Sequence, residues 1–390
     1  MKIKYIELFS GIGAFTQAIE NLSYVNSECV FAADINIACA NVYRKNYNVE
    51  SLCDITLQNE KKIKKHDLCF FSPPCQAFSK SGKQKGFEDT RGTLIYDVFR
   101  ILEEKKPRFI LMENVRNLVS HNDGKTIATI NDALRNLGYR IPETPIILSP
   151  HYFGVPQTRE RAFLPGIYDP ENVDKPLVIK FDRFITKDEC SIEDIIDHKY
   201  DNDLSLKINK HEEKLLKIWN DFYQGLDVKV IGFPIWYDYF FDKDLEEDIP
   251  SWKKEFILKN KELYLRNKKH IDKWAKKYNY LADLTPTQRK FEWQAGEKIS
   301  SIWDGIIQLR PSGVRVKAPT TLPALVAIVQ IPIIGNLKRR LSVRECANLQ
   351  SFSVDFIPDE NRYEAYKQFG NSINVRVLQE VLDKLLKYKD

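Results

Sequence analysis

The chain has 390 residues, of which 43% are hydrophobic, and a formal net charge of +5. This composition predicts a soluble globular protein of two or three domains and excludes collagen-like, low-complexity and disordered chains. The sequence contains no apolar run of about 18 residues and no signal-peptide pattern, so we expect no membrane-spanning helix and a cytoplasmic location.

Seven cysteines are spread along the chain, and their number is odd. No Cys-x-x-Cys pair occurs, so neither a disulfide framework nor a zinc ribbon is indicated, and we expect no metal site. The net charge of +5 permits a polyanionic partner without requiring one.

The first half of the chain alternates between short apolar strands and helices. Strands are predicted over residues 4–9, 29–33, 68–71 and 108–112, and a helix over 15–22 follows the first of them. This order predicts a parallel, doubly wound α/β sheet. Ligands of such sheets bind beyond the carboxyl ends of the strands, where this sequence places polar and glycine-containing groups.

A glycine turn, Ser10-Gly11-Ile12-Gly13, joins the first strand to the first helix. Glycines there let a ligand approach the backbone, and a helix N-terminus favours a negative group. The third glycine of the dinucleotide fingerprint is missing. Asp34 ends the second strand about 20 residues on, where such folds bind a ribose. An adenosine ligand is therefore favoured over a dinucleotide, and an ordinary tight turn is the alternative.

The third strand ends in Ser72-Pro73-Pro74-Cys75-Gln76. The two prolines restrict the backbone and would hold Cys75 rigidly at the edge of the site. Residues 77–91 contain glycines and lysines, which is typical of a mobile, positively charged loop. A thiol near lysines gains thiolate character, so Cys75 is a candidate nucleophile, and an inert core cysteine is the alternative.

Two further motifs carry charged groups that suit catalysis. Glu113 ends the fourth strand, and a carboxylic acid in a buried pocket can stay protonated near neutral pH and act as an acid. The alternative is a helix-capping or ion-paired glutamate. Arg159 and Arg161 stand at i and i+2, so they point the same way in an extended segment. Their planar guanidinium groups can bind a carboxylate or a carbonyl oxygen. The alternative is that both arginines are ordinary surface charges.

The alternation of strands and helices is lost in the middle of the chain, from about residue 181 to residue 330. Residues 251–277 carry ten Lys or Arg against three acids. Ile271, Trp274 and Tyr278 lie at i, i+3 and i+7, which predicts an amphipathic basic helix, with a merely solvated helix face as an equal alternative. Helices are predicted again around residues 342–349 and 375–388.

The ordered set of motifs is far more specific than any one of them. It closely resembles the DNA cytosine-5 methyltransferases, particularly the bacterial modification enzymes. The resemblance covers residues 1–165 and about 336–390, and the block from Pro74 to Leu94 matches the family's catalytic loop almost residue for residue. The motifs are Glu7–Phe15, Asp34, Asp54, Pro73–Gln76, Glu113–Val115, Gln157–Arg161, Arg340–Leu349 and Gly370–Ser372.

The resemblance implies a Rossmann-like, S-adenosyl-L-methionine-dependent methyltransferase domain at residues 1–180 and 331–390, and a smaller target-recognition domain at 181–330. Phe9 would stack on the adenine of the cofactor, and Asp34 would hold the ribose. The other implied cofactor residues are Gly11, Gly13, Ile35, Asp54, Ile55, Pro74, Leu94, Asn371 and Ser372. Ala14 and Ser72 stand where many relatives have glycine, and Ala14 is tolerated if that residue is helical.

The resemblance also implies a covalent mechanism on double-stranded DNA. Cys75 would attack C6 of a flipped-out cytosine, so that C5 takes the methyl group and S-adenosyl-L-homocysteine is the product. Glu113 would donate a proton to N3 and Arg161 would anchor O2, while Arg159 would hold the pocket. Arg310 and Arg315 would contact base edges or phosphates, with plain surface charge as the alternative. The expected DNA contacts are Gln76, Ser79, Ser81, Lys83, Arg310, Arg315 and Thr321.

Two other functions stay open at this point. Relatives that methylate transfer RNA share the catalytic motifs, but they carry a late Cys-Phe-Thr tripeptide that this sequence lacks. A non-catalytic DNA-binding protein would be expected to lack Cys75, Glu113 or the glycines, and all of them are present. The resemblance favours a monomeric modification enzyme whose cognate restriction endonuclease is a genetic partner only.

Overall fold

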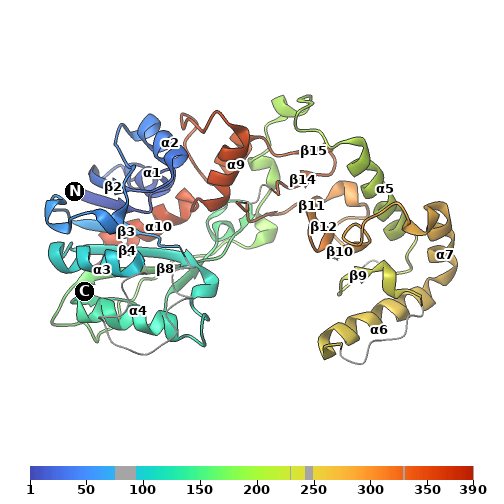
Figure 1. The fold of residues 1–390 in the computed structure, drawn as a ribbon, viewed down its shortest axis with the longest axis horizontal. Helices are drawn as coiled ribbons and strands as arrows, with labels where there is room; N and C mark the ends of the chain where they lie inside the picture. Colours follow the sequence, from blue (N-terminus) through green and yellow to red (C-terminus); the bar gives the residue numbers. More distant parts are fainter. Residues whose placement is uncertain (75–93, 229, 242–248, 328–329, 390) are drawn as a thin grey trace. The chain divides into compact units, whose positions relative to one another are not determined.

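The structure is a computed structural model and describes residues 1–74, 94–228, 230–241, 249–327 and 330–389. The chain divides into two compact units (Figure 1). Unit 1 comprises Met1–Cys190 and Cys346–Asp390, and unit 2 comprises Ser191–Glu345.

Unit 1 contains, in its described part, a seven-stranded sheet in the order β2-β1-β3-β4-β8-β5, with β6 paired to β8. Its strands are β1 (Lys2–Leu8), β2 (Asn26–Ala33), β3 (Leu68–Phe71), β4 (Phe109–Val115), β5 (Tyr139–Arg140), β6 (Ile146–Leu148) and β8 (Arg161–Tyr168), and the short β7 (Gln157–Thr158) lies outside the sheet. Its helices are α1 (Ala14–Glu20), α2 (Ile37–Tyr47), α3 (Leu94–Lys105), α4 (Lys125–Asn136), α9 (Arg362–Asn371) and α10 (Val375–Leu386).

The strand directions confirm the predicted doubly wound α/β fold and add one departure from it. β1 pairs in parallel with β2 and β3, and β3 pairs in parallel with β4. β8 instead runs antiparallel to β4, β5 and β6. The sheet is therefore mixed, and its four parallel strands carry the ends that the sequence marked as functional.

Both faces of this sheet are covered by helices, with α3 and α4 on one face and α1, α2 and α10 on the other (Figure 1). Ile6 and Phe71 belong to the core that the sheet forms with α3 and α4. On the other face, Phe15 of α1 stacks on Phe70 of β3 with ring centroids 4.4 Å apart. Because both faces are buried at the centre of the sheet, β3 is apolar throughout and β4 is apolar from Phe109 to Met112.

Unit 2 contains, among its described residues, a six-stranded sheet in the order β15-β14-β11-β12-β10-β9. Its strands are β9 (Ile235–Trp236), β10 (Lys290–Gln294), β11 (Ile306–Arg310), β12 (Gly313–Lys317), β14 (Ile333–Ile334) and β15 (Arg339–Arg340), with β13 (Leu322–Pro323) outside the sheet. Its helices are α5 (Lys210–Gln224), α6 (Ser251–Arg266) and α7 (Lys268–Lys277), and α8 (Val343–Leu349) begins in it.

An aromatic core holds unit 2 together. Trp219 of α5 stacks on Phe291 of β10 with ring centroids 5.1 Å apart, and Trp274 of α7 lies 5.7 Å from Trp219. Aromatic pairs at these distances add stability beyond the area that they bury. Unit 2 therefore has a hydrophobic core of its own.

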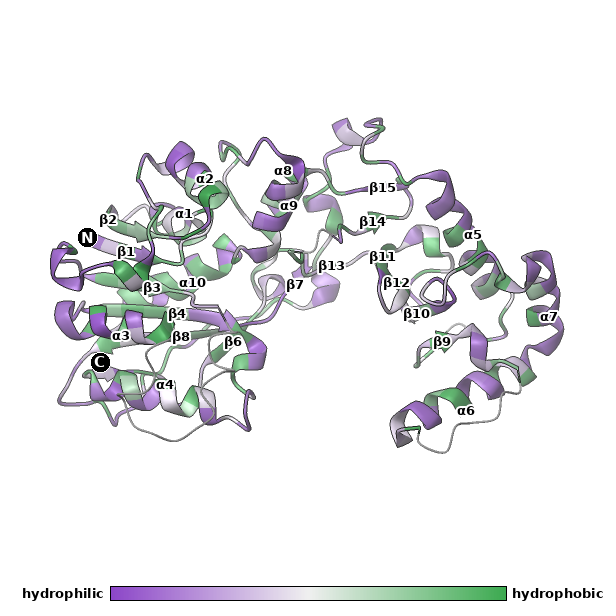
Figure 2. Cartoon of the chain, in the orientation of Figure 1, coloured by the Kyte–Doolittle hydropathy of each residue, from purple (hydrophilic) through white to green (hydrophobic). Residues whose placement is uncertain are grey.

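The basic stretch 251–277 forms two helices, α6 and α7, where one was predicted. Asn267 separates them: its Nδ2 donates to the backbone O of Leu263, and its Oδ1 accepts from the backbone N of Asp227. The backbone of Asn267 leaves the helical region, with φ −112° and ψ 22°, so α6 ends and α7 begins at this residue. The predicted apolar stripe is buried at Ile271 and Trp274, and the hydropathy colours alternate along both helices (Figure 2). None of the described helices is long and apolar enough to cross a membrane.

The unit boundaries lie at 190/191 and 345/346, whereas the sequence placed them at 180/181 and 330/331. Phe181 and Phe184 both pack against Phe153, which keeps the segment after residue 180 in unit 1. At the other end, β14 and β15 continue the sheet of unit 2 through β11. Side-chain packing and strand pairing therefore extend past the points where the composition changes.

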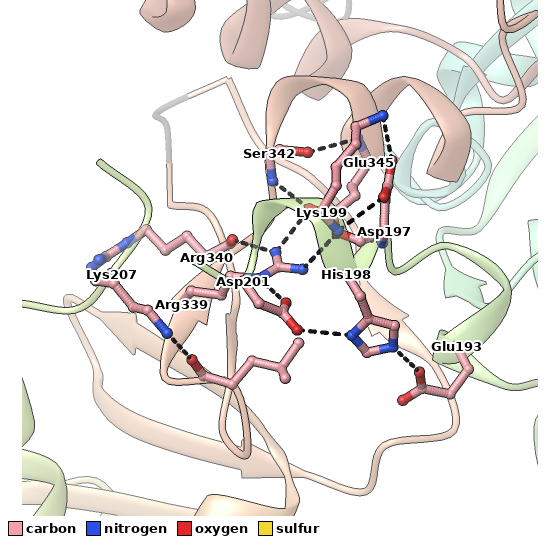
Figure 3. A network of polar contacts seen from close by, with 11 residues as sticks. Glu193, Asp197, His198, Lys199, Asp201, Lys207, Arg339, Arg340, Ser342 and Glu345 are labelled. Atoms are coloured by element: carbon pink, nitrogen blue, oxygen red, sulfur yellow. Dashed lines mark hydrogen bonds and ion pairs between the residues drawn. The ribbon is translucent and has the colours of Figure 1, made fainter. Parts of the chain in front are cut away.

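A buried ion network ties the two ends of unit 2 together (Figure 3). Arg339 is fully buried, and its guanidinium donates to Asp201 at 2.8 Å and to both carboxylate oxygens of Glu345 at 2.9 and 3.0 Å. Glu345 in turn accepts from the backbone N–H groups of Asp197 and Ser342. Each buried charge is thus paired and hydrogen-bonded, which a buried ion pair requires.

Candidate cofactor and catalytic site

A cavity of about 610 Å³ lies at the carboxyl ends of the parallel strands of unit 1. Its volume falls within the range of roughly 300–1,000 Å³ that is typical of small-molecule sites. Segments far apart in the sequence meet there, and most of the predicted cofactor and catalytic residues line it. These are Phe9, Gly11, Asp34, Ile35, Asp54, Ile55, Pro74, Leu94, Glu113, Arg159, Arg161, Asn371 and Ser372.

The glycine turn forms one wall of the cavity. Phe9 and Gly11 both have left-handed backbone conformations, with φ of 60° and 53°. Gly13, at φ 85°, caps α1, and a Cβ at this position would lie 2.2 Å from the ring of Tyr47. Gly13 therefore supports the turn from behind, while Gly11 faces the cavity. Ala14 is the first residue of α1, so the helical condition for alanine is met.

Asp34 fixes the turn from the end of β2. Its two carboxylate oxygens accept hydrogen bonds from the backbone N–H groups of Gly11 and Asn36, both at 2.8 Å. A carboxylate oxygen has a second acceptor position. The carboxylate therefore stands in a fixed orientation at the cavity with capacity for a hydroxyl group of a ligand.

Asp54 and Ile55 lie on the neighbouring edge of the cavity. The Asp54 carboxylate accepts from the hydroxyl and the backbone N–H of Thr56, and these hydrogen bonds lower the pKa of Asp54. Ile55 is buried, whereas Ile35, which also lines the cavity, is 73% exposed. An exposed isoleucine beside a cavity offers an apolar surface to a flat ring.

Glu113, the predicted catalytic acid, is buried, with 4% exposure. Its Oε1 lies 3.1 Å from Nε of Arg161, and its Oε2 accepts from the Ser72 hydroxyl at 2.6 Å. Burial raises the pKa of Glu113, while Arg161, Ser72 and Arg159 act to lower it. Burial therefore favours the protonated form of Glu113, which is the form that can donate a proton.

Arg159 is buried and holds the C-terminal segment of unit 1. Its Nη2 donates to the backbone oxygens of Gly370 and Ser372 at 2.8 and 2.9 Å. Burial and the neighbouring Arg161 lower the pKa of Arg159 to about 9, so its guanidinium stays protonated at neutral pH. Arg159 thereby brings Asn371 and Ser372 to the cavity.

Two residues that shape the site had no role predicted from the sequence. Ser72 appeared only as a harmless replacement for glycine, yet its hydroxyl binds Glu113. Asn114 is buried, and its Nδ2 donates to the backbone O of Pro73 at 2.9 Å, which fixes the start of the Pro-Pro segment. Both contacts join residues 41 positions apart, so no local pattern could have revealed them.

The structure does not describe every predicted residue. Cys75, Gln76, Ser79, Ser81 and Lys83, with the rest of the predicted loop 77–91, fall outside the described residues. Pro74, the last described residue before them, lines the cavity. Within the part of the chain that the structure describes, no group of His, Cys, Asp and Glu is arranged to hold a metal ion.

The predicted recognition residues belong to unit 2. Arg315 of β12 donates to both carboxylate oxygens of Glu292 on the neighbouring strand β10, at 2.8 and 3.1 Å. Arg310, at the end of β11, lies 3.5 Å from the same carboxylate. Thr321 is buried. The two arginines thus share one acidic partner, which the sequence did not indicate.

Comparison with known proteins identifies the family of this chain. The family model of C-5 cytosine-specific DNA methylases matches residues 3–387. The Type II methyltransferase M.AluI of Cellulosimicrobium cellulans is 31% identical, over 98% of this chain and 91% of its own length. The Type II methyltransferase M.HhaI of Haemophilus parahaemolyticus is 28% identical, over 97% and 93%.

Solved structures share the fold at lower identity. The S. pombe Dnmt2 methyltransferase has a TM-score of 0.54 and 20% identity, over 99% of this chain and 98% of its own. The Entamoeba histolytica methyltransferase EhMeth has a TM-score of 0.56 and 20% identity, over the same shares. Together, the fold, the cavity and the match of nearly the whole chain to the family model show that this protein belongs to the C-5 cytosine-specific DNA methylases and is a DNA cytosine-5 methyltransferase.

Proposed function

We propose that this methyltransferase moves a methyl group from S-adenosyl-L-methionine to C5 of a flipped-out cytosine in double-stranded DNA, through a covalent adduct on Cys75. The single observation that carries the proposal is the buried Glu113 acid, which shares a cavity with Asp34 and the glycine turn. The Type II names of the relatives support a role as a modification enzyme that protects host DNA from a cognate restriction enzyme.

Three features of the cavity support S-adenosyl-L-methionine as the cofactor. The left-handed turn at Phe9 and Gly11 leaves the backbone open to a ligand. Asp34 keeps acceptor capacity for ribose hydroxyls, and Ile35 offers an apolar surface to the adenine. When bound, this cofactor supplies an electrophilic methyl group, and it leaves as S-adenosyl-L-homocysteine.

Glu113 and Arg161 act on the cytosine ring. A nucleophile that adds at C6 pushes negative charge onto N3 and O2. Glu113 donates a proton to N3, and the Arg161 guanidinium stabilises charge on O2. Because this charge appears only as the adduct forms, both groups stabilise the adduct more than the free base.

Cys75 supplies the nucleophile. Its thiolate bonds to C6, C5 then takes the methyl group, a base removes the C5 proton, and loss of the thiolate restores the aromatic ring. The cytosine must leave the duplex stack first, which costs roughly a few kcal/mol. Asn114 fixes Pro73, so the segment that leads to Cys75 begins at a defined point.

Unit 2 recognises the target sequence in this proposal. One face of its sheet carries polar side chains, while Phe291, Val314 and Val316 of the same strands point into the core. Arg310 and Arg315 stand on the polar face. Arginine is the side chain that most often reads guanine edges, and it also binds phosphates.

The test is transfer of a radiolabelled methyl group from S-adenosyl-L-methionine to duplex DNA. Wild type should label the DNA, and Cys75→Ser and Glu113→Gln should lose most of the label. Cys190→Ser is the matched control, because its hydroxyl can donate to the backbone O of His151 or of Thr186, as the thiol does. Label that enters transfer RNA but no DNA would contradict the proposal.

A further inference from the structure

Glu7 is a buried acid that the proposed mechanism does not use. It lies in β1, is 1% exposed, and has apolar neighbours on the adjacent strands, Ala32 in β2 and Phe70 in β3. No lysine or arginine forms an ion pair with it in the described part of the chain. A buried acid is costly to ionise without compensating hydrogen bonds, so its partners indicate what it does.

Those partners come from two helices. The Thr16 hydroxyl of α1 donates to Glu7 Oε2 at 2.6 Å, and the Tyr43 hydroxyl of α2 donates to the same oxygen at 2.9 Å. Tyr5 donates to the Thr16 hydroxyl at 3.0 Å. The backbone N–H groups of Phe15 and Thr16 also bind the carboxylate. One carboxylate therefore holds the first turn of α1 and the middle of α2 against β1.

This first turn is the continuation of the glycine turn. Gly13 caps α1, and the hydroxyl of Tyr47 in α2 donates to the backbone O of Gly13 at 3.0 Å. α2 therefore supports the turn twice, directly through Tyr47 and indirectly through Tyr43 and Glu7. Glu7 itself lines the cavity that contains Phe9 and Asp34.

Building on the proposed cofactor, we propose that Glu7 is a positioning residue for S-adenosyl-L-methionine. Its ionised carboxylate fixes the start of α1 and so holds the glycine turn in the shape that the cofactor requires. A protonated carboxyl would have to donate one hydrogen bond and would lose an acceptor position. It would therefore hold the donors Thr16, Tyr43 and the two backbone N–H groups less well.

Glu7 is the member of this network whose charge changes near neutral pH. Burial raises its pKa to about 7. The groups that face it stay neutral there, since burial raises the pKa of Cys29 in β2 to about 12 and moves Tyr5, Tyr43 and Tyr47 above their ordinary value. Glu20, at the far end of α1, acts on Tyr5 and Tyr47. Affinity for the cofactor should thus rise as pH rises through about 7.

The experiment measures the Kd of S-adenosyl-L-methionine for the full chain by calorimetry from pH 6 to pH 8.5. Glu7→Gln should bind about tenfold more weakly than wild type at pH 8, since it loses hydrogen bonds to a charged acceptor. Its affinity should show no step near pH 7. Its single-turnover rate at saturating cofactor should change little, because the ground-state site is what it alters.

Two controls and a second variant make the result specific. Glu28→Gln changes an exposed glutamate that pairs with Lys4, and it should match wild type. Glu113→Gln removes the other buried acid of the cavity and should keep the step in affinity. Tyr43→Phe deletes one donor to the Glu7 carboxylate, so the step in cofactor affinity should move to higher pH. If Glu7→Gln does not fold, Tyr43→Phe tests the role of Glu7 in its place.

The outcomes separate this inference from the proposed function. A wild type that binds the cofactor with no step near pH 7 would overturn the role of Glu7 and leave the proposed function standing. Unchanged affinity in Glu7→Gln, or an unmoved step in Tyr43→Phe, would do the same. A wild type that does not bind S-adenosyl-L-methionine at any pH would overturn the proposed function and the inference with it.

Discussion

At the scale of single residues, Glu113 illustrates how opposite effects meet at one carboxyl group. Burial disfavours its charged form, whereas Arg161 at 3.1 Å and the Ser72 hydroxyl at 2.6 Å favour it. Burial is the larger effect, and the pKa stays above its ordinary value. An acid that must give up a proton to N3 and recover it later needs such a balance.

This balance predicts a pH dependence. The single-turnover rate of wild type should fall as pH rises through the raised pKa of Glu113, because the acid form is lost. Glu113→Gln keeps the size but has no proton to transfer, so its rate should drop about 10²–10⁴-fold and lack the alkaline fall. Glu160→Gln, whose carboxylate pairs with Arg116, is the control. If the single-turnover rate of Glu113→Gln still falls as pH rises, Glu113 is not the catalytic acid.

Asp34 allows a test of the cofactor site that measures binding alone and does not depend on methyl transfer. Asp34→Ala removes the acceptor proposed for the ribose and also frees the backbone N–H of Gly11. Binding of S-adenosyl-L-methionine should weaken by roughly 1.5–3 kcal/mol, as for a hydrogen bond to a charged group. Calorimetry measures this directly. An unchanged Kd would remove Asp34 from the site.

At the scale of elements, β10, β11 and β12 place polar side chains in a row across one sheet face. Glu292, Arg315 and Gln308 are cross-strand neighbours in register. Glu292 orients the Arg315 guanidinium through two hydrogen bonds. A preoriented arginine fork loses less freedom when it meets a guanine or a phosphate.

Arg315→Ala should weaken DNA binding in one of two ways. If Arg315 reads a base, binding to the cognate site should lose about 1–3 kcal/mol, and the preference at one position should relax. If it binds phosphate, all sequences should bind less well, and the salt slope should fall by about one. Binding to cognate and single-mismatch duplexes at several salt concentrations separates the two. Wild-type behaviour in both assays would show that unit 2 reads DNA with other residues.

The buried network around Arg339 makes a prediction about stability. Arg339→Met leaves the buried Glu345 without its partner, which costs roughly 3–5 kcal/mol in comparable pairs. All six tryptophans lie between residues 219 and 303, inside unit 2, so tryptophan fluorescence reports the unfolding of unit 2. The urea midpoint measured this way should fall. An unchanged midpoint would mean that the network does not stabilise the unit.

At the scale of the whole molecule, the sequence predicted most of unit 1 and of its cavity because the signals there are local. Apolar strands that end in Gly11, Asp34, Pro74 and Glu113 place these residues at one sheet edge whatever the rest of the fold. The mixed sheet, the break at Asn267 and the unit boundaries were missed, because each depends on a partner distant in sequence. The same holds for the contact of Arg315 with Glu292.

The position of the transferred methyl group is the most direct test of the proposed DNA cytosine-5 methylation. Duplex DNA of mixed sequence is incubated with the full chain and S-adenosyl-L-methionine, and 5-methylcytosine is then mapped by sequencing. We expect 5-methylcytosine at one recurring sequence, and none formed by Cys75→Ser. Methylation of another base or atom, or no methylation of any DNA sequence by a chain that binds the cofactor, would contradict it.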